Sequence, residues 1–266
     1  MLRPTAANAL IAVALAFAVI LAANVGVTAL LMAVEGIDQV TPERTVGPGL
    51  VIQGVCMLFF VSRWAQATQG GAVWNLAAGP AVRWWLVLFI VPAGLLGDYV
   101  IQELVRYFPE LMAPNMDLLA GALESQRVWI LIGAVGLAPF YEELLFRGLV
   151  WRGLERDLGA PAAWAGTTVL FAAFHMDPLQ MAGVLFIGGW LGWIRLATGS
   201  VVPCIAAHLA NNLGWALLGG VLPVSELPAW TPLATLGALA AAVALSVKPP
   251  SSTPPSGLGP PDARGP

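Results

Sequence analysis

The stretch PTAANALIAVALAFAVILAANVGVTALLMAV (residues 4–34) decides the fold class. It runs for 31 residues without a charge, whereas about 20 apolar residues are enough for a helix to cross a bilayer. It is also longer than the apolar core of a cleavable signal peptide, which has about 7–15 residues. We therefore expect a retained membrane-spanning helix in this part of the chain.

The remaining composition extends this expectation to the whole chain. Hydrophobic residues make up 58% of the 266 positions and charged residues only 10%, against roughly 25% charged residues in a soluble domain. Further apolar runs lie at 45–62, 84–105, 128–151, 160–176, 178–194, 199–222 and 228–247. The sequence thus predicts an all-α, polytopic transmembrane helix bundle of about eight spans. The net charge of −3 excludes a basic nucleic-acid-binding surface, so no nucleic-acid partner is expected.

The chain divides into one membrane domain and a tail. We expect an integral-membrane domain over residues 1–248, with an interfacial segment at 107–127 among the spans. Residues 249–266 contain seven prolines and predict a disordered, Pro-rich tail. With the N-terminus in the cytoplasm, eight basic residues near span ends fall inside and three outside. Both termini are therefore expected to be cytoplasmic.

Three ionisable residues stand where lipid should exclude them. Glu142, Glu143 and Arg147 fall late in the fourth expected span, and placing all three in lipid would cost about 8–10 kcal/mol. They must face a protein-lined or wet cavity, unless the segment begins a cytoplasmic amphipathic helix with solvated charges. Glu143 and Arg147 are four residues apart, which favours a structural ion pair. Glu142 is turned about 100° away and remains free for other chemistry.

Each of the two histidines lies within a long apolar segment. Phe171 precedes His175 by one helical turn, and Asn212 follows His208 by one turn. A single buried histidine is usually a satisfied core group. Imidazole next to a carboxylate suits water activation, however, and an amide suits stabilisation of an oxyanion. Taken together, the residues indicate a hydrolase site buried in a membrane.

These residues form three ordered motifs: EExxxR (Glu142, Glu143, Arg147), FxxxH (Phe171, His175) and HxxxN (His208, Asn212). In this order they resemble the CPBP family of CAAX and bacteriocin-processing intramembrane proteases, which includes the type II CAAX prenyl endopeptidases. The resemblance covers a core at about 128–220. It implies a catalytic cavity inside the membrane, where Glu142 and His175 activate water and His208 and Asn212 stabilise the oxyanion. Glu143, Arg147 and Phe171 then serve as structural support.

The metal requirement stays open at this point. Glu142, His175 and His208 also form a two-histidine, one-carboxylate set of the kind that binds catalytic zinc, although the sequence has no HExxH motif. The family is described both as metalloproteases and as metal-independent glutamate proteases. We expect either a zinc-dependent metalloprotease or a metal-independent mechanism.

The expected helix depths conflict. At 1.5 Å per residue, Glu142 lies about 21 Å from the outer end of its span, and His175 lies about 22 Å from the inner end of the next. The two side chains would then miss each other. Either the fourth helix continues to Trp151, which centres Glu142, or the fifth helix is tilted or broken at Pro178.

The leading hypothesis is an intramembrane endopeptidase that acts on a membrane-associated or lipidated peptide. Its expected partners are membrane lipid and a peptide or protein substrate. A non-catalytic scaffold or immunity protein of the same fold is the alternative. A transporter would need similar halves, and the polar cluster occupies only residues 142–212. Eleven of the twelve basic residues are arginine, which suggests a GC-rich, bacterial genome and an inner-membrane location.

Overall fold

The computed structural model describes residues 5–69, 71–77, 114–176 and 178–218, together with single positions at 230, 237, 240 and 241. These residues form helices and short links, with no strand in the described ranges. The predicted all-α class is therefore confirmed for this part of the chain. The expected span at 84–105 and the tail at 249–266 lie outside the described residues, as does nearly all of the span at 228–247.

The first two helices form an antiparallel pair. Helix α1 (Ala6–Glu35) and helix α2 (Pro42–Gln69) are joined through the 3₁₀ turn η1 (Ile37–Gln39). The Thr5 side chain caps α1 by accepting from the Asn8 amide at 3.2 Å, and Gly36 ends it with a φ of 95°. Alanines occupy the buried face of α1, whereas large apolar residues such as Leu21 are exposed. This is the arrangement of a helix that packs through small residues and presents large ones to lipid.

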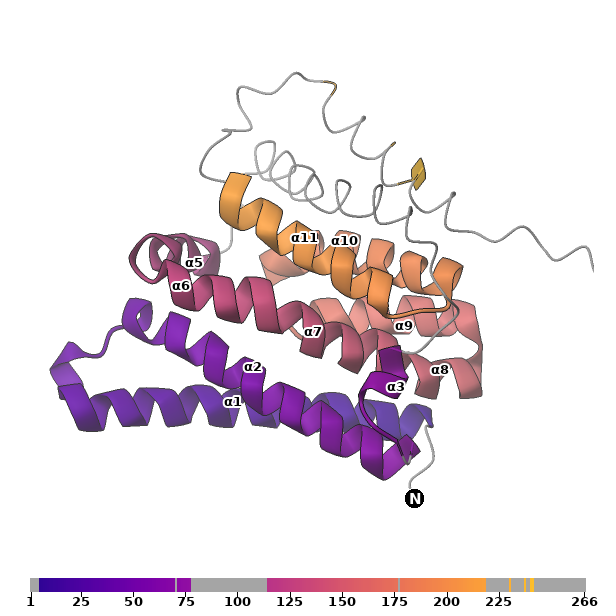
Figure 1. Ribbon diagram of the computed structural model, residues 1–266, viewed down its shortest axis with the longest axis horizontal. Coiled ribbons are helices and arrows are strands. Elements are labelled where there is room, and N and C mark those ends of the chain that lie inside the picture. The colour runs from indigo at the N-terminus through magenta and orange to yellow at the C-terminus, as the bar shows by residue number, and fades with distance from the viewer. Residues whose placement is uncertain are drawn as a thin grey trace, which may run out of the picture.

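A long central helix carries the first motif. It runs from Arg127 to Leu158 without a break and comprises α6 (Arg127–Ile130), η4 (Leu131–Leu137), α7 (Ala138–Glu143), η5 (Leu144–Val150) and α8 (Trp151–Leu158). Helix α5 (Pro114–Ser125) precedes it and covers most of the segment expected to be interfacial. Figure 1 shows the central helix between the α1–α2 pair and the later helices. It continues past the predicted end at residue 151, so Glu142 has 15 residues before it (127–141) and 16 after it (143–158).

Two π turns, η4 and η5, flank the short α-helical segment α7. The Ala138 amide donates to the carbonyl of Gly133, and the Trp151 amide donates to that of Phe146. Both bonds span five residues, as in a π turn. Pro139 explains the first one, because it has no amide hydrogen to continue the α-helical pattern. A regular helix was expected from the sequence, so these irregularities are a finding of the structure.

Glycines let the central helix approach its neighbours closely. A Cβ atom on Gly133 would lie 2.6 Å from Leu50 Cβ in α2, and one on Gly153 would lie 2.6 Å from the carbonyl oxygen of Thr5. Neither distance is compatible with a side chain. Close approach through small residues is the usual means by which helices associate in a membrane, and here it fixes the depth of the central helix against α1 and α2.

The remaining described helices are α3 (Trp74–Ala77), α9 (Ala160–Ala173), α10 (Pro178–Thr198) and α11 (Val202–Leu218). Helix α9 ends before Pro178, so the broken fifth helix that we considered is present together with the longer fourth one. Three helices in the described part are long and apolar enough to cross a membrane: α1, α2 through Thr68, and residues 127–158. They mark an integral membrane protein, but they do not confirm the predicted number of eight spans.

Candidate active site

The two glutamates lie at the middle of the central helix. Glu143 is fully buried and Glu142 is 7% exposed, and every residue from 141 to 150 is buried. The central helix contacts α1, α2, α9 and α11, so no side of this segment is open to lipid. The solvated amphipathic helix that we considered is therefore wrong. Buried carboxylates require partners, and the central helix and α11 supply them.

Arg147 is the cationic partner of Glu143. Its Nη1 atom lies 3.1 Å from Glu143 Oε1, and both side chains are completely buried. Its Nη2 atom donates to the carbonyl of Gly188 in α10 at 2.8 Å, and its guanidinium lies 4.5 Å from the centre of the Phe171 ring. The pair predicted from the spacing of four residues is thus present, and it also ties α9 and α10 to the central helix.

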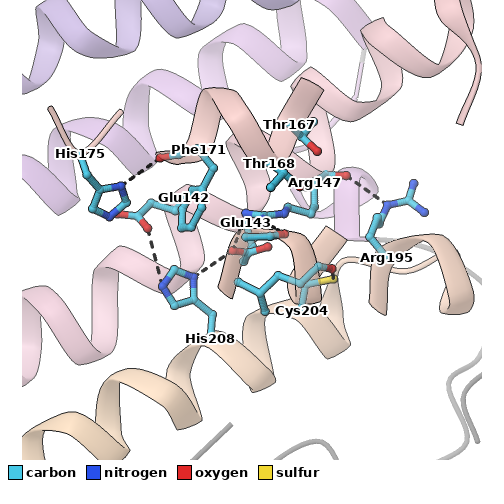
Figure 2. A network of polar contacts seen from close by, with 12 residues as sticks. Glu142, Glu143, Arg147, Thr167, Thr168, Phe171, His175, Arg195, Cys204 and His208 are labelled. Atoms are coloured by element: carbon cyan, nitrogen blue, oxygen red, sulfur yellow. Dashed lines mark hydrogen bonds and ion pairs between the residues drawn. The ribbon is translucent and has the colours of Figure 1, made fainter. Parts of the chain in front are cut away.

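His208 of α11 stands against both carboxylates. Its Nδ1 atom lies 2.9 Å from Glu143 Oε1, and its Nε2 atom lies 3.8 Å from Glu142 Oε2. A carboxylate only accepts, so Nδ1 carries a hydrogen and donates to Glu143. Figure 2 shows this imidazole between the two glutamates, with Arg147 on the far side of Glu143. Glu143 therefore orients His208 in addition to pairing with Arg147.

His175 follows the last turn of α9 and is held by its own backbone. Its Nδ1 atom lies 2.9 Å from the carbonyl oxygen of Phe171. Because a carbonyl cannot donate, Nδ1 carries the hydrogen and Nε2 of the neutral ring is an acceptor. The Phe171 ring packs edge-on against His175 at 5.1 Å and against His208 at 5.7 Å. One aromatic side chain thus sets the orientation of both imidazoles.

Asn212 is attached to the first π turn. Its Nδ2 atom donates to the carbonyl of Ala134 at 2.8 Å. In a regular α-helix this carbonyl would accept from the Ala138 amide, which donates to Gly133 instead. The residue one position further on is Pro139, which has no amide hydrogen. The π turn thereby releases a carbonyl, and α11 docks on it.

Of the four residues predicted to be catalytic, the structure joins only Glu142 and His208 directly. Within the described residues, the one ion pair of Glu142 is with His208, and no hydrogen bond links Glu142 to His175. Figure 2 shows the His175 imidazole and the Glu142 carboxylate on the same side of the cluster. Asn212 makes its contacts with Ala134 and with Asn211, whose Nδ2 lies 3.5 Å from its Oδ1.

The metal alternative does not fit the described side chains. In the ranges that the structure describes, no three histidine, cysteine, aspartate or glutamate side chains converge in a way that could hold a metal ion. Glu142, His175 and His208 all belong to those ranges. The metalloprotease expected as one alternative is therefore not supported.

Sequence reasoning missed three polar neighbours of the cluster. Tyr141 is buried beside Glu142 and accepts a hydrogen bond from Gln53 of α2 at 2.9 Å. Arg195 of α10 donates from Nε to the carbonyl of Arg147 at 3.1 Å. Tyr141 directly precedes the glutamate pair, which was a usable signal. Gln53 and Arg195 lie on α2 and α10, and no spacing in the sequence connects either residue to the EExxxR motif.

The comparison with protein families agrees with the motifs. Residues 124–214 match the family described as type II CAAX prenyl endopeptidase Rce1-like. This segment covers 91 of the 266 residues (124 to 214 inclusive) and includes all seven motif residues. No curated protein and no solved structure matches the chain. The predicted resemblance to the CAAX-type intramembrane proteases is thus confirmed over about a third of the chain.

Proposed function

We propose that this protein is an intramembrane endopeptidase that hydrolyses a peptide bond of a membrane-associated or lipidated peptide with an activated water molecule. The observation that carries the proposal is the buried cluster of Glu142, His208, Glu143 and Arg147 at the midpoint of a 32-residue apolar helix. Ionisable groups at this depth are expensive and usually functional. The cluster lies inside the segment that matches the endopeptidase family.

In this proposal, Glu142 and His175 activate the water. The Nε2 atom of His175 is the acceptor of its ring, because Nδ1 donates to the Phe171 carbonyl. The Glu142 carboxylate lies 3.8 Å from His208 Nε2, which is too far for a strong hydrogen bond to that ring, so it can take a proton from water. General base assistance of this kind contributes about 10²–10⁴-fold to a rate.

His208 and Asn212 stabilise the oxyanion in the same proposal. Two carboxylates and one guanidinium leave this cluster with a net charge of −1, which a protonated His208 would balance. The imidazolium would then donate from Nδ1 to Glu143, at the observed 2.9 Å, and from Nε2 to the developing negative charge. Asn212 uses one amide hydrogen on Ala134 and keeps a second one for the substrate.

The mechanism that we propose needs no metal, because both the base and the oxyanion donors are protein side chains. Activity should therefore survive dialysis against a chelator such as EDTA, and added zinc should not raise it. A loss of activity on chelation that zinc restores would contradict this part of the proposal.

The proposed substrate is a peptide held at the membrane, either a prenylated CAAX peptide or an unprenylated membrane peptide such as a bacteriocin precursor. We propose a bacterial inner membrane with both termini in the cytoplasm, from the arginine content and the distribution of basic residues. The same orientation places the two ends of the central helix in different leaflets.

The deciding experiment is peptide cleavage by the purified protein in lipid vesicles. Quenched fluorescent peptides with and without an isoprenoid would be compared for wild type, Glu142→Gln, and Glu124→Gln in the exposed part of α5 as the matched control. We expect at least about 100-fold loss in the first variant and none in the second. Equal, background-level cleavage by all three would favour the non-catalytic scaffold.

A further inference from the structure

A line of hydrogen bonds leads from the first helix to Tyr141, the residue before the proposed catalytic glutamate. The Nδ2 atom of Asn24 in α1 donates to Gln53 Oε1 in α2 at 2.9 Å. The Nε2 atom of Gln53 then donates to the hydroxyl oxygen of Tyr141, also at 2.9 Å. Tyr141 is 2% exposed and is the residue before Glu142. Three helices thus contribute one polar side chain each.

Asn24 determines which group donates and which accepts in each of these hydrogen bonds. Asn24 donates both to Gln53 and to the carbonyl of Ile20, at 2.9 Å. Since Gln53 receives a hydrogen on its oxygen, its amide nitrogen faces Tyr141 and can only donate. The tyrosine oxygen therefore accepts, and its own hydrogen is directed elsewhere. Glu142 directly follows Tyr141 in the chain, and its carboxylate is the negatively charged group beside the buried hydroxyl.

The packing around Asn24 leaves room for its side-chain amide between α1 and α2. A Cβ atom on Gly49 of α2 would lie 2.8 Å from Asn24 Oδ1, so the glycine leaves room for the amide. Both helices are apolar enough to cross a membrane, where a polar side chain has to find a partner. Asn24 and Gln53 also lie outside the segment that matches the endopeptidase family.

We propose that Asn24 and Gln53 aim the Tyr141 hydroxyl at the Glu142 carboxylate, so that Tyr141 is a positioning residue for water activation. This inference rests on the proposed function. The other groups that face the carboxylate are His208 from α11, at 3.8 Å, and Glu143, which reaches the same imidazole. Figure 2 shows the His175 imidazole on the same side of the cluster as the Glu142 carboxylate. Gln53 of α2 reaches the tyrosine hydroxyl at 2.9 Å, whereas the imidazole of His208 comes from α11.

The first test is a double-mutant cycle on cleavage in vesicles. Tyr141→Phe keeps the ring and removes the hydroxyl, and we expect kcat to fall about tenfold with KM within about twofold. Gln53→Leu should lower kcat in the wild-type chain but not further in the Tyr141→Phe chain, because it acts through the hydroxyl. Asn24→Ala should also lower kcat in the wild-type chain, by a smaller factor, and not further in the Tyr141→Phe chain. This variant replaces Gln53→Leu in the cycle if Gln53→Leu does not fold.

The matched control is Thr68→Val on the same helix. Thr68 is buried and donates to the carbonyl of Trp64, one turn earlier in α2, at 2.8 Å. The Thr68→Val substitution should leave kcat unchanged in both the wild-type and the Tyr141→Phe chains. If the effects of Gln53→Leu and Tyr141→Phe multiply, or if only KM changes, the positioning role is wrong.

An infrared measurement separates this inference from the proposed function. The carboxyl stretch of Glu142, assigned by its loss in Glu142→Gln, responds to hydrogen bonding whether or not the protein cleaves peptides. The band should shift equally in Tyr141→Phe and Gln53→Leu, and not in Thr68→Val. An inactive wild type with these shifts would overturn the proposed function while supporting the positioning contact. An active wild type whose band does not shift would overturn the inference alone.

Discussion

Replacement of Arg147 by methionine should strongly destabilise the protein, and the structure gives the size of the effect. The change keeps much of the side-chain volume but removes the ion pair with Glu143 at 3.1 Å, the bond to the Gly188 carbonyl at 2.8 Å and the contact with the Phe171 ring. Loss of one partner from a buried pair costs about 3–5 kcal/mol, since the other charge is stranded. His208 still donates to Glu143, which favours the lower end of that range.

The assay is thermal unfolding in detergent micelles, together with the yield of folded protein. For a chain of this size the loss corresponds to a fall in Tm on the order of 10 °C. Arg63→Met is the matched control, because Arg63 is exposed on α2 and donates only to Gln66. A second chain carrying Glu143→Gln with Arg147→Met removes the stranded charge and should recover at least half of the lost stability.

Two results would refute this reasoning. If Arg147→Met unfolded at the wild-type temperature with full yield but did not cleave, Arg147 would act in the chemistry. If the double variant were no more stable than Arg147→Met alone, the cost would come from lost packing against Phe171 and Gly188 rather than from a stranded carboxylate.

Three further substitutions test the scaffold of the site. Asn212→Asp places two acceptors face to face at the Ala134 carbonyl. It should cost about 1–3 kcal/mol of stability and lower turnover about 10²–10³-fold. A wild-type cleavage rate in this variant would exclude Asn212 as an oxyanion donor. Pro139→Ala restores an amide hydrogen that competes with Asn212, so turnover should fall about two- to tenfold without a loss in Tm. Gly188→Ala brings a Cβ atom to 3.0 Å from the Phe171 ring and should cost about 1–3 kcal/mol. Unchanged Tm in that last variant would show that the ring can move freely.

Local features of the fold could be predicted from the sequence because they depend on short stretches of chain. The first span was expected at 4–34 and lies at Ala6–Glu35, since an uncharged run and the Thr5 and Gly36 caps define it without reference to the rest of the molecule. The contact between Glu143 and Arg147 follows from helical periodicity alone. The motifs likewise predicted the family match, because each is written within five or six residues.

The contacts between helices could not be predicted in the same way. We expected an ion pair between Glu143 and Arg147. The Oε1 atom of Glu143 also accepts from His208, 65 positions later in the chain. That contact depends on how α11 docks, and docking depends on the carbonyl that Pro139 and η4 release to Asn212. The depth mismatch expected between Glu142 and His175 depended on the assumed helix ends: Arg127–Leu158 forms one helix with Glu142 at its middle, and α9 ends at Ala173, before His175.

The second π turn, η5, binds α10 in the same way as η4 binds α11. In a regular helix the Trp151 amide would bond to the Arg147 carbonyl, but it donates to Phe146 instead. Arg195 Nε donates to the Arg147 carbonyl at 3.1 Å, and its guanidinium lies 5.3 Å from the centre of the Trp151 ring. Each π turn beside α7 thus offers a backbone carbonyl to a different later helix. The two irregularities thereby fix α11 and α10 around the glutamate pair, and π turns in other proteins are likewise frequent at functional sites.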